Sequence, residues 1–477
     1  MRGWDATRIA EASGSRLLRE PSGTSRAPGP MRAGIDSRML GADDLFVGLR
    51  GERADGGAHA AEALAGGAWG VLVAPEHARA AERAQAPGAV LEHPDPLAAL
   101  QQLAAAWRRE LGAGGAKVIA ITGSTGKTST KDILASLLAS HLRTAASAAN
   151  LNTEIGLPLA ILAAPRDSEA LVLEMAMRGS GQIAELTAIA TPDVGVIVNV
   201  GPAHLELLGS LEAVAAAKAE LIAGLAPGAT IVLPYREPLL EPHLRTDLRT
   251  ITFGDGGDVR LLERRPDGRT RIRHGEREIE LWPSFGARHN LQNLLAAVAV
   301  AGAIGITPAG RLQVRFSDMR GDRIALANGV ILVDDCYNAN PMSMRAAIDD
   351  LAETAPARRV ALLGDMLELG PDAPRLHREV GRHAHARGVE LLVTAGPLAA
   401  EISAGFGGEA HVAQDAAGAA ELLAGLLRPR DTVLVKGSRG VGLERAVATL
   451  RAAAGRPATG EALDGDPLTP AAGSGRR

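Results

Sequence analysis

The run TGSTGKT, which ends at Thr128, carries the residue types that hold the phosphates of a nucleotide. Gly123 and Gly126 permit a tight turn of the backbone. Lys127 can reach the terminal phosphates, and the hydroxyl of Thr128 can ligate Mg²⁺. The usual pattern G-x-x-x-x-G-K-[ST] requires a glycine where this chain has Ile121. The run is therefore either a chance GKT or a variant phosphate loop.

Three further residues suited to chemistry follow in chain order: Glu174 after the apolar run LVL, His204 in NVGPAHL and Lys218 in VAAAKAEL. Glu174 and His204 each follow a predicted parallel strand, at the sheet edge where ligands bind. A structural role for each is the alternative. Lys218 is one of five lysines, against 51 lysines and arginines together. Chemistry that needs an amine able to lose its proton requires lysine, whereas a neutral residue on an exposed helix face is the alternative.

Short apolar runs bounded by Gly, Asp or Asn must position these residues, and they alternate with helical patterns. Such runs are typical of strands buried on both faces of a parallel sheet, so we predict an α/β fold. The predicted strand segments are 69–74, 117–123, 169–176, 194–201, 329–335, 358–365, 389–396 and 431–437.

At 477 residues the chain is too long for one hydrophobic core, and its breaks suggest three domains. We predict an N-terminal domain over residues 1–112, a central phosphate-loop domain over 113–312 and a C-terminal α/β domain over 313–455. Linkers near the two boundaries are the expected hinges for closure around substrates. Residues 456–477 are rich in Gly, Pro and small side chains, so we expect a disordered tail.

The composition narrows the class of protein. A hydrophobic fraction of 46% with 22% charged residues is ordinary for a globular protein, and a net charge of −4 does not indicate nucleic acid or an anionic membrane as a partner. No apolar window approaches the ~20 residues of a membrane span, and the N-terminus lacks a signal-peptide pattern. The single cysteine, Cys336, excludes an internal disulfide and has no evident His partner, so we interpret it as structural. We expect a cytoplasmic monomer.

The phosphate run fits the variant T-G-[ST]-x-G-K-T at every position, and with it the sequence resembles the Mur ligase superfamily. These are ATP-dependent amide ligases of cell-wall peptide assembly, together with folylpolyglutamate synthase relatives. The resemblance extends from about residue 33 to 450 through at least six motifs in family order. It implies that the nucleotide is bound by Thr122, Gly123, Ser124, Thr125, Gly126, Lys127 and Thr128.

The resemblance also implies a metal centre with two Mg²⁺ ions. Thr128, Glu174 and His204 are the expected ligands, and Lys218 is expected to be carbamylated by CO₂, which gives an anion that orients the second ion. The small apolar neighbours of Lys218 support this, because a desolvated lysine has a lowered pKa and more neutral amine. We assign no catalytic role to Glu220.

For the rest of the nucleotide, the resemblance points to two segments. His289, Asn290 and Asn293 in GARHNLQN are expected to frame the adenine side, and the alternative is that Asn290 caps the helix that follows. In DDCYNANP we expect Asp335 on the ribose and Tyr337 or Asn338 near the base or phosphates. Arg323 is the expected γ-phosphate ligand, with Arg320 as the competing candidate. The implied catalytic set is Lys127, Lys218, His204 and Arg323.

The motif D-[DS]-x-Y-N-A-N-P is typical of the branch that adds D-alanyl-D-alanine, and the D-N-P-R motif of the diaminopimelate- or lysine-adding branch is not found. In the N-terminal domain, IDSRMLGADDLFVG resembles the part that binds the UDP-sugar, and a surface turn is the alternative. A solvated turn is likewise the alternative for LVKGSRG. The expected substrate-binding residues are Ser37, Arg38, Asn152, Thr153, Lys436, Ser438 and Arg439.

The expected reaction is transfer of the γ-phosphate of ATP to the terminal carboxylate of a UDP-N-acetylmuramoyl-tripeptide. The amine of D-alanyl-D-alanine then attacks the acyl phosphate, and phosphate leaves. Two rival interpretations are another amide ligase, such as a folylpolyglutamate synthase, and a phosphate-loop ATPase or switch without ligase chemistry. The Y-N-A-N-P motif argues against the first. The second would leave Glu174, His204 and Lys218 without a function.

Overall fold

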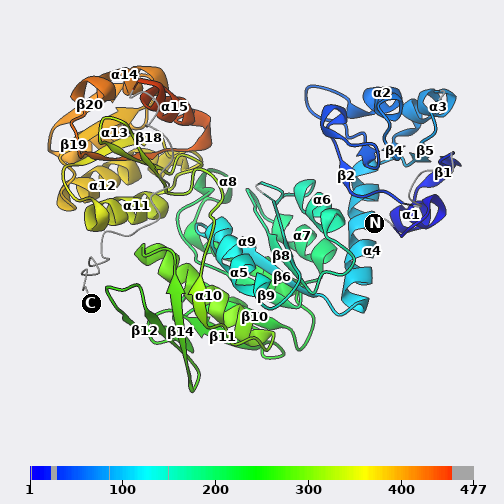
Figure 1. Cartoon of the computed structure of the whole chain (residues 1–477), viewed down its shortest axis with the longest axis horizontal. Helices are drawn as coiled ribbons and strands as arrows, with labels where there is room; N and C mark the ends of the chain where they lie inside the picture. The colour runs from blue at the N-terminus through cyan, green and yellow to red at the C-terminus, as the bar shows by residue number, and fades with distance from the viewer. Residues whose placement is uncertain (2, 23–28, 85, 149, 454–477) are drawn as a thin grey trace, which may run out of the picture.

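The computed structural model describes residues 1, 3–22, 29–84, 86–148 and 150–453, and the predicted disordered tail at 456–477 lies outside them. Three β-sheets follow one another along the chain, each with its own helices, which confirms the predicted α/β fold in three domains (Figure 1). In the described part of the chain, every helix is too short or too polar to cross a membrane.

The first sheet has five strands in the order β1-β5-β4-β3-β2, with β1 antiparallel to β5 and the other neighbours parallel. Strands β3 and β4 are buried along their whole length, as their apolar sequences LFV and GVLV require. The strands are β1 Arg16–Arg19, β2 Ala33–Gly34, β3 Leu45–Val47, β4 Gly70–Val73 and β5 Ala89–Glu92. The helices are α1 Ala6–Ser13, η1 Ser37–Met39, η2 Gly56–His59, α2 Ala60–Ala65, α3 Pro75–Arg83 and α4 Pro96–Ala113.

The second sheet has ten strands, and β6 lies in its parallel part between β9 and β8. The sequence predicted a parallel sheet here. Strands β12, β13 and β14 pair antiparallel, so this sheet is mixed. Their sequences VRLLER, TRIRH and REIELWP interleave charged with apolar residues, which suits strands with one solvated face. Such strands are not predicted by a pattern of continuous apolar runs.

The strands of this sheet are β6 Lys117–Thr122, β7 Thr144–Ala146, β8 Ala170–Glu174, β9 Val194–Ile197, β10 Thr230–Pro234, β11 Arg249–Phe253, β12 Val259–Arg264, β13 Thr270–His274, β14 Arg277–Pro283 and β15 Gly310–Leu312. Its helices are α5 Lys127–Ala139, α6 Gly156–Ala163, α7 Gln182–Ala190, α8 Leu205–Leu208, α9 Leu211–Gly224, η3 Glu241–His243 and α10 Arg288–Ala303.

The third sheet has six strands in the order β16-β17-β21-β18-β19-β20, parallel except for the edge strand β16. Its strands are β16 Asp322–Ala325, β17 Ile331–Asp334, β18 Arg359–Gly364, β19 Leu391–Ala395, β20 Ala410–Ala413 and β21 Thr432–Lys436. Its helices are α11 Pro341–Thr354, η4 Gly370–Asp372, α12 Ala373–Ala386, α13 Ala400–Phe406, α14 Ala416–Leu426, η5 Arg439–Val441 and α15 Glu444–Ala453.

Helix α4 joins the first two sheets and packs on both sides of the boundary predicted at residue 112 (Figure 1). Trp107 is 1% exposed, and its indole Nε1 donates to the Ala164 carbonyl at 3.1 Å. The Arg108 guanidinium bonds the Ala190 carbonyl at 2.8 Å and the Asp193 carboxylate at 3.1 Å. One apolar cluster continues from Trp4 through α4 into the central domain. A hinge at residue 112 is therefore wrong, because that residue lies in the last turn of a helix that both domains hold.

Candidate active site

The phosphate loop connects β6 to α5, as the sequence predicted. Gly126 precedes the helix in a left-handed conformation with φ 75°, and a Cβ at this position would lie 2.7 Å from the Asn293 side-chain oxygen. Glycine is therefore required there by both conformation and space. The half-buried Lys127 folds back, and its Nζ donates to the Gly123 carbonyl at 2.8 Å. The loop has the geometry of an anion site at a helix N-terminus.

Asn199 braces this loop, and the sequence analysis did not assign it a role. Its Oδ1 accepts the Thr125 backbone N–H at 2.9 Å, and its Nδ2 donates to the Thr125 carbonyl at 3.2 Å. Ser124 Oγ bonds the backbone of Gly201 close by. The signal was available: Asn199 follows β9, whose neighbour in the sheet is β6, so both carboxyl ends meet at one edge.

Glu174 ends β8 and lies opposite Ile121 of β6, which brings its carboxylate beneath the phosphate loop. The side chain is 2% exposed. Oε1 accepts the Asn152 amide at 2.8 Å, whereas the buried Oε2 has no hydrogen-bond partner among the residues that the structure describes. A buried carboxylate oxygen without a partner is costly unless a cation or a donor completes it. This oxygen suits a hard cation such as Mg²⁺, which prefers oxygen ligands.

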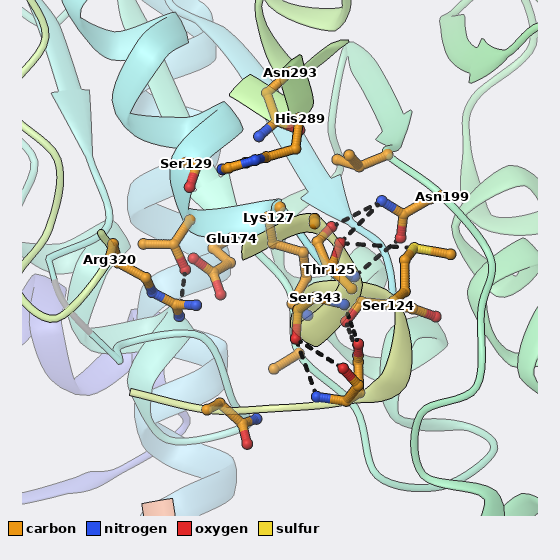
Figure 2. A pocket seen from close by; sticks show the side chains of 18 of the residues that line it. Ser124, Thr125, Lys127, Ser129, Glu174, Asn199, His289, Asn293, Arg320 and Ser343 are labelled. Atoms are coloured by element: carbon orange, nitrogen blue, oxygen red, sulfur yellow. Dashed lines mark hydrogen bonds between the residues drawn. The ribbon is translucent and has the colours of Figure 1, made fainter. Parts of the chain in front are cut away.

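Lys127 lies within electrostatic range of two charged groups on other elements. Burial lowers the pKa of the Lys127 amine, the Glu174 carboxylate opposes that change, and the Arg320 guanidinium adds to it. Figure 2 shows Lys127, Glu174 and Arg320 around the same part of the pocket. The site therefore holds two cationic groups and one carboxylate close together.

Lys218 belongs to α9, and 1% of its surface is exposed. It is not among the residues that line the cavity. Among the described residues, none makes a hydrogen bond or ion pair with its ammonium. Burial lowers the pKa of Lys218 well below its usual value, and the charge of Lys127 contributes in the same direction. The alternative of an exposed, neutral helix position is excluded. Glu220, two residues on, caps α7 through the backbone N–H groups of Gly181 and Ala184.

His204 is the N-cap residue that precedes α8, and it lines the cavity in a left-handed conformation with φ 57°. Its Nδ1 lies 2.5 Å from Glu368 Oε2, which belongs to the loop after β18 in the C-terminal domain. Burial lowers the pKa of His204, and Glu368 opposes the change. Among the described residues, the one group of three or more His, Cys, Asp or Glu side chains close enough to share an ion is Asp55, Glu76 and His77 in the N-terminal domain.

The C-terminal domain closes the opposite side of the cavity. Arg320 reaches across the boundary, and its guanidinium donates to Thr128 Oγ1 at 3.2 Å. The same guanidinium stacks on the Tyr337 ring with 4.2 Å to the centroid. Asn340 Nδ2 donates to the Ser124 carbonyl at 3.3 Å and also caps α11. These residues enclose a cavity of about 1190 Å³.

Comparison with known proteins identifies the family. Family profiles match three segments: "Mur ligase family, catalytic domain" at residues 32–108, "Mur ligase middle domain" at 121–301 and "Mur ligase, glutamate ligase domain" at 319–439. A UDP-N-acetylmuramoyl-tripeptide–D-alanyl-D-alanine ligase of Synechocystis is 37% identical over 426 residues, covering 87% of this chain and 91% of that protein. The chain belongs to the Mur ligase family.

Solved Mur ligase structures share the whole fold. MurF from Acinetobacter baumannii superimposes with a TM-score of 0.81 at 29% identity, over 94% of this chain and 99% of that one. MurF ligase from Thermotoga maritima, solved in complex with ADP, gives 0.75 at 30% identity over 88% and 97% of the two chains. The order of the three domains around the cavity is therefore that of known Mur ligases.

Within this Mur ligase, Arg320 and not Arg323 lies beside the phosphate loop, at Thr128. Arg323 lies on β16, and its guanidinium pairs with Asp350 at 3.3 Å and with Thr354 on α11. It faces α11 and not the cavity. The two arginines are three residues apart, but only Arg320 belongs to the loop that crosses the boundary.

The three residues expected to meet the peptide are also placed differently. Lys436 is 2% exposed, and its ammonium bonds Asp335 Oδ2 at 2.7 Å and the Asn338 carbonyl at 3.0 Å. Ser438 Oγ is buried and accepts the Leu367 N–H at 2.9 Å. Arg439 remains exposed beside Tyr337, with 5.7 Å between its guanidinium and the ring centroid. Lys436 therefore holds the loop of Asp335 and Asn338 at the cavity wall, whereas Arg439 is not among the residues that line the cavity.

Other expected residues divide between the cavity wall and the structure behind it. His289, Asn293, Asp335, Tyr337, Asn338, Asn152 and Thr153 line the cavity, as do Ser124 to Thr128 of the loop. Thr122 is buried at the end of β6, and Gly123 serves as an acceptor for Lys127. Asn290 is buried against Asn293 at 3.1 Å within α10, whose N-cap is Ala287, so Asn290 does not cap that helix.

The N-terminal candidates line a second, separate cavity of about 470 Å³. Ser37 and Arg38 share it with Phe46 and His59, and the exposed Arg38 pairs with Asp36 at 2.8 Å. A guanidinium beside small polar groups suits a phosphate. Cys336 is buried, and burial raises the pKa of its thiol further with the help of Asp334, which fits a structural role.

Proposed function

We propose that this chain joins D-alanyl-D-alanine to UDP-N-acetylmuramoyl-tripeptide in an ATP-dependent reaction that yields the muramoyl-pentapeptide, ADP and phosphate. The observation that carries the proposal is one cavity in which the phosphate loop, Arg320 and a Glu174 oxygen without a partner in the described part of the chain meet. The names of the curated relatives and the ADP complex of the Thermotoga structure support the substrates.

The reaction proceeds in two steps. A carboxylate oxygen of the tripeptide attacks the γ-phosphorus of ATP, and the bond from that phosphorus to the bridging oxygen breaks. ADP departs, and the tripeptide now carries an acyl phosphate. The amine of D-alanyl-D-alanine then attacks the acyl carbon, the bond from that carbon to the phosphate oxygen breaks, and phosphate leaves. The amine proton passes to solvent or to the departing phosphate. Neither step needs a protein nucleophile, which agrees with the buried, weakly acidic Cys336.

The protein's task is to offset the negative charge that gathers when a carboxylate attacks a phosphate. Lys127 approaches from the phosphate loop, and Arg320 approaches from the C-terminal domain to within 3.2 Å of Thr128. Because the two cations come from different domains, the full charge is assembled only when the domains meet. The remaining nucleotide contacts are proposed for His289, Asn293, Asp335, Tyr337 and Asn338, all of which line the cavity.

Mg²⁺ is proposed as the metal. The Glu174 Oε2 and the Thr128 hydroxyl fit it, because one is a buried oxygen without a partner and the other stands at the start of the phosphate-binding helix. His204 is proposed as a ligand of a second ion. Bound there, the ions would supply charge neutralisation on the phosphates. Asn152 orients Glu174 by holding its other oxygen at 2.8 Å.

We also propose that Lys218 carries a carbamate. The neutral amine attacks the carbon of CO₂, a nitrogen–carbon bond forms, one proton passes to solvent, and an anion replaces the cation. The burial of Lys218, its lowered pKa and its lack of a partner among the described residues all favour the neutral amine. The carbamate would also remove the repulsion between Lys218 and Lys127.

The proposal extends to the molecule's organisation. The boundaries at about 112 and 312 remain our proposal for the domains, with closure about the second of them. A cytoplasmic monomer is also part of the proposal, and residues of all three parts of the site, the phosphate loop, Glu174 and Arg320, come from this one chain. The N-terminal cavity at Ser37 and Arg38 is proposed for the UDP-sugar.

The deciding assay gives the purified protein ATP, D-alanyl-D-alanine and UDP-muramoyl-tripeptides that end in diaminopimelate or in lysine. We expect phosphate release that depends on the dipeptide, with the pentapeptide detected by mass spectrometry. Phosphate release that ignores the dipeptide, without pentapeptide, would favour a phosphate-loop ATPase and contradict the proposal. Product from a folate substrate and glutamate would favour the other rival.

Lys218 has its own test. We expect Lys218→Ala and Lys218→Arg to abolish ligation, and a short carboxylic acid to restore part of the rate to the Ala variant. Lys117→Arg is the matched control, because Lys117 is exposed at the start of β6 and should tolerate the change. Full activity in Lys218→Arg would refute the carbamate.

A further inference from the structure

The contact between His204 and Glu368 links two domains at the edge of the active site. His204 Nδ1 and Glu368 Oε2 are 2.5 Å apart although the residues are separated by 164 positions. The backbone follows the side chains, because the Glu206 N–H donates to the Glu368 carbonyl at 3.1 Å. The other Glu368 oxygen is 3.7 Å from the Arg178 guanidinium. Glu368 therefore contacts the central domain through both its side chain and its main chain.

Both residues adopt backbone conformations that a side chain disfavours. His204 has φ 57° and Glu368 has φ 62°, each in the left-handed region. A non-glycine residue held there costs on the order of 1 kcal/mol or more, and such residues concentrate at functional sites. Glycine would remove this cost but could not make the side-chain contact. The pairing of two such residues across a domain boundary points to a role for the side chains.

The loop that carries Glu368 is held firmly by its own domain. His377 is fully buried, its Nε2 accepts the Met366 N–H at 2.9 Å, and its Nδ1 lies 2.6 Å from the Ala373 carbonyl. Ser438 Oγ accepts the Leu367 N–H at 2.9 Å. The two residues before Glu368 thus have fixed N–H groups, so Glu368 moves with the C-terminal domain as a rigid part of it.

A carboxylate at Nδ1 determines what the other ring nitrogen of His204 can do. When Nδ1–H donates to Glu368, Nε2 has no proton and keeps its lone pair for a metal ion. Carboxylates of this kind also fix the ring's orientation, and their loss typically costs 10–100-fold in metal affinity. This step rests on the proposed function, in which His204 is a metal ligand.

We propose that Glu368 is a positioning residue that sets the tautomer and orientation of His204, and that it does so only when the C-terminal domain docks. The same docking brings Arg320 to Thr128 and Asn340 to Ser124. Metal affinity and phosphate coordination are therefore coupled through one rigid-body contact. The C-terminal domain completes the metal site without supplying a ligand to it.

The test measures Mn²⁺ binding by electron paramagnetic resonance in the full chain, with a non-hydrolysable ATP analogue at saturation. We expect Glu368→Ala to weaken Mn²⁺ binding about 10-fold or more. Glu368→Gln should lose less, because its amide oxygen still accepts from Nδ1–H. Glu401→Ala is the matched control: Glu401 is a carboxylate of the same domain that pairs with Arg378 at 2.5 Å, and its loss should leave Mn²⁺ affinity unchanged. Melting temperatures confirm that each variant is folded.

A double-mutant cycle separates this inference from the proposed function. If Glu368 acts through His204, Glu368→Ala should have no further effect on Mn²⁺ affinity in the His204→Ala background. Additive losses would overturn the inference, as would wild-type affinity in Glu368→Ala while His204→Ala binds weakly. Wild-type affinity in His204→Ala would instead overturn the metal role of His204, and with it the inference that depends on it.

Discussion

The two domain boundaries of this chain are built in opposite ways. Between the N-terminal and central domains, α4 carries an apolar cluster that includes Trp4 and Trp107, whose rings meet edge to face at 5.2 Å. Between the central and C-terminal domains, three contacts are polar, Arg320 to Thr128, Asn340 to Ser124 and Glu368 to His204, and Leu205 of α8 adds an apolar contact to the C-terminal cluster. Apolar burial makes a permanent joint, whereas hydrogen-bonded contacts between wettable surfaces can open and close.

The difference between the two boundaries indicates where substrates enter. A reaction that assembles three substrates needs one boundary that separates, and the polar one adjoins the phosphate loop. The apolar boundary can then hold the UDP-sugar cavity at a constant place relative to the phosphates.

The largest effect is expected at the apolar boundary. Trp107→Ala removes a side chain that is 1% exposed and bonded to the Ala164 carbonyl, so the free energy of unfolding should fall by about 3–5 kcal/mol. Urea unfolding followed by circular dichroism measures it. Trp282→Ala is the control, since this half-buried ring on β14 should cost about 1 kcal/mol. Equal losses would show that α4 is not a special joint.

The second prediction concerns the polar boundary. Arg320→Ala should lower kcat by about 100-fold, as loss of one preorganised donor to a developing charge does. Its melting temperature should stay near that of the wild type. Arg323→Ala is the control, because its pair with Asp350 is worth about 1 kcal/mol or less and Arg323 itself does not line the cavity. If Arg323→Ala loses activity and Arg320→Ala does not, the assignment of the two arginines is reversed.

A smaller effect is expected for Asn340, which caps α11 and also bonds Ser124. Asn340→Ala should cost about 1 kcal/mol of stability and should also raise the KM for ATP. Asp415→Ala is the control. The Asp415 carboxylate caps α14 by accepting the Gly418 N–H at 2.9 Å, and α14 lies far from the boundary (Figure 1). It should cost as much stability and leave KM unchanged. Equal KM values would mean that Asn340 only caps its helix.

The smallest effect is a difference between two unfolding midpoints of the wild type. All four tryptophans lie before residue 313, and the single cysteine, Cys336, lies after it. Tryptophan emission therefore reports the first two domains, and alkylation of the buried Cys336 reports the third. If the polar boundary couples the domains weakly, the midpoints in urea should differ by about 0.3 M, equivalent to about 1 kcal/mol. Coincident transitions would contradict the contrast between the boundaries.

Much of the phosphate-loop site could be predicted from the sequence because its parts are neighbours in the chain. A strand, two glycines, Lys127 and a helix occupy consecutive positions, and short-range sterics determine the turn between them. Glu174 could be predicted as well, since a residue at the end of a buried parallel strand must lie at the ligand edge of the sheet. The charged strands β12, β13 and β14 escaped prediction because their pattern is not a continuous apolar run.

The choice between Arg320 and Arg323 could not be made from the sequence. Antiparallel pairing of β16 with β17 starts at Asp322, so Arg323 is committed to a strand face and Arg320 stays in the loop. The position of Lys436 also depends on strand pairing. Strand β21 pairs parallel with β17, which brings the Lys436 ammonium to Asp335, 101 positions away. Strand register decided both outcomes, and register depends on partners distant in the chain.

By itself, the sequence determined the α/β class, the phosphate loop and the residue types of the site, because these follow from local backbone sterics and apolar periodicity. Only the tertiary structure decided which charges meet: Arg320 with Thr128, Lys436 with Asp335 and Glu368 with His204. The physical reason is that each of these contacts joins distant segments. Its geometry follows from how whole cores pack and dock, and no short stretch of sequence specifies that.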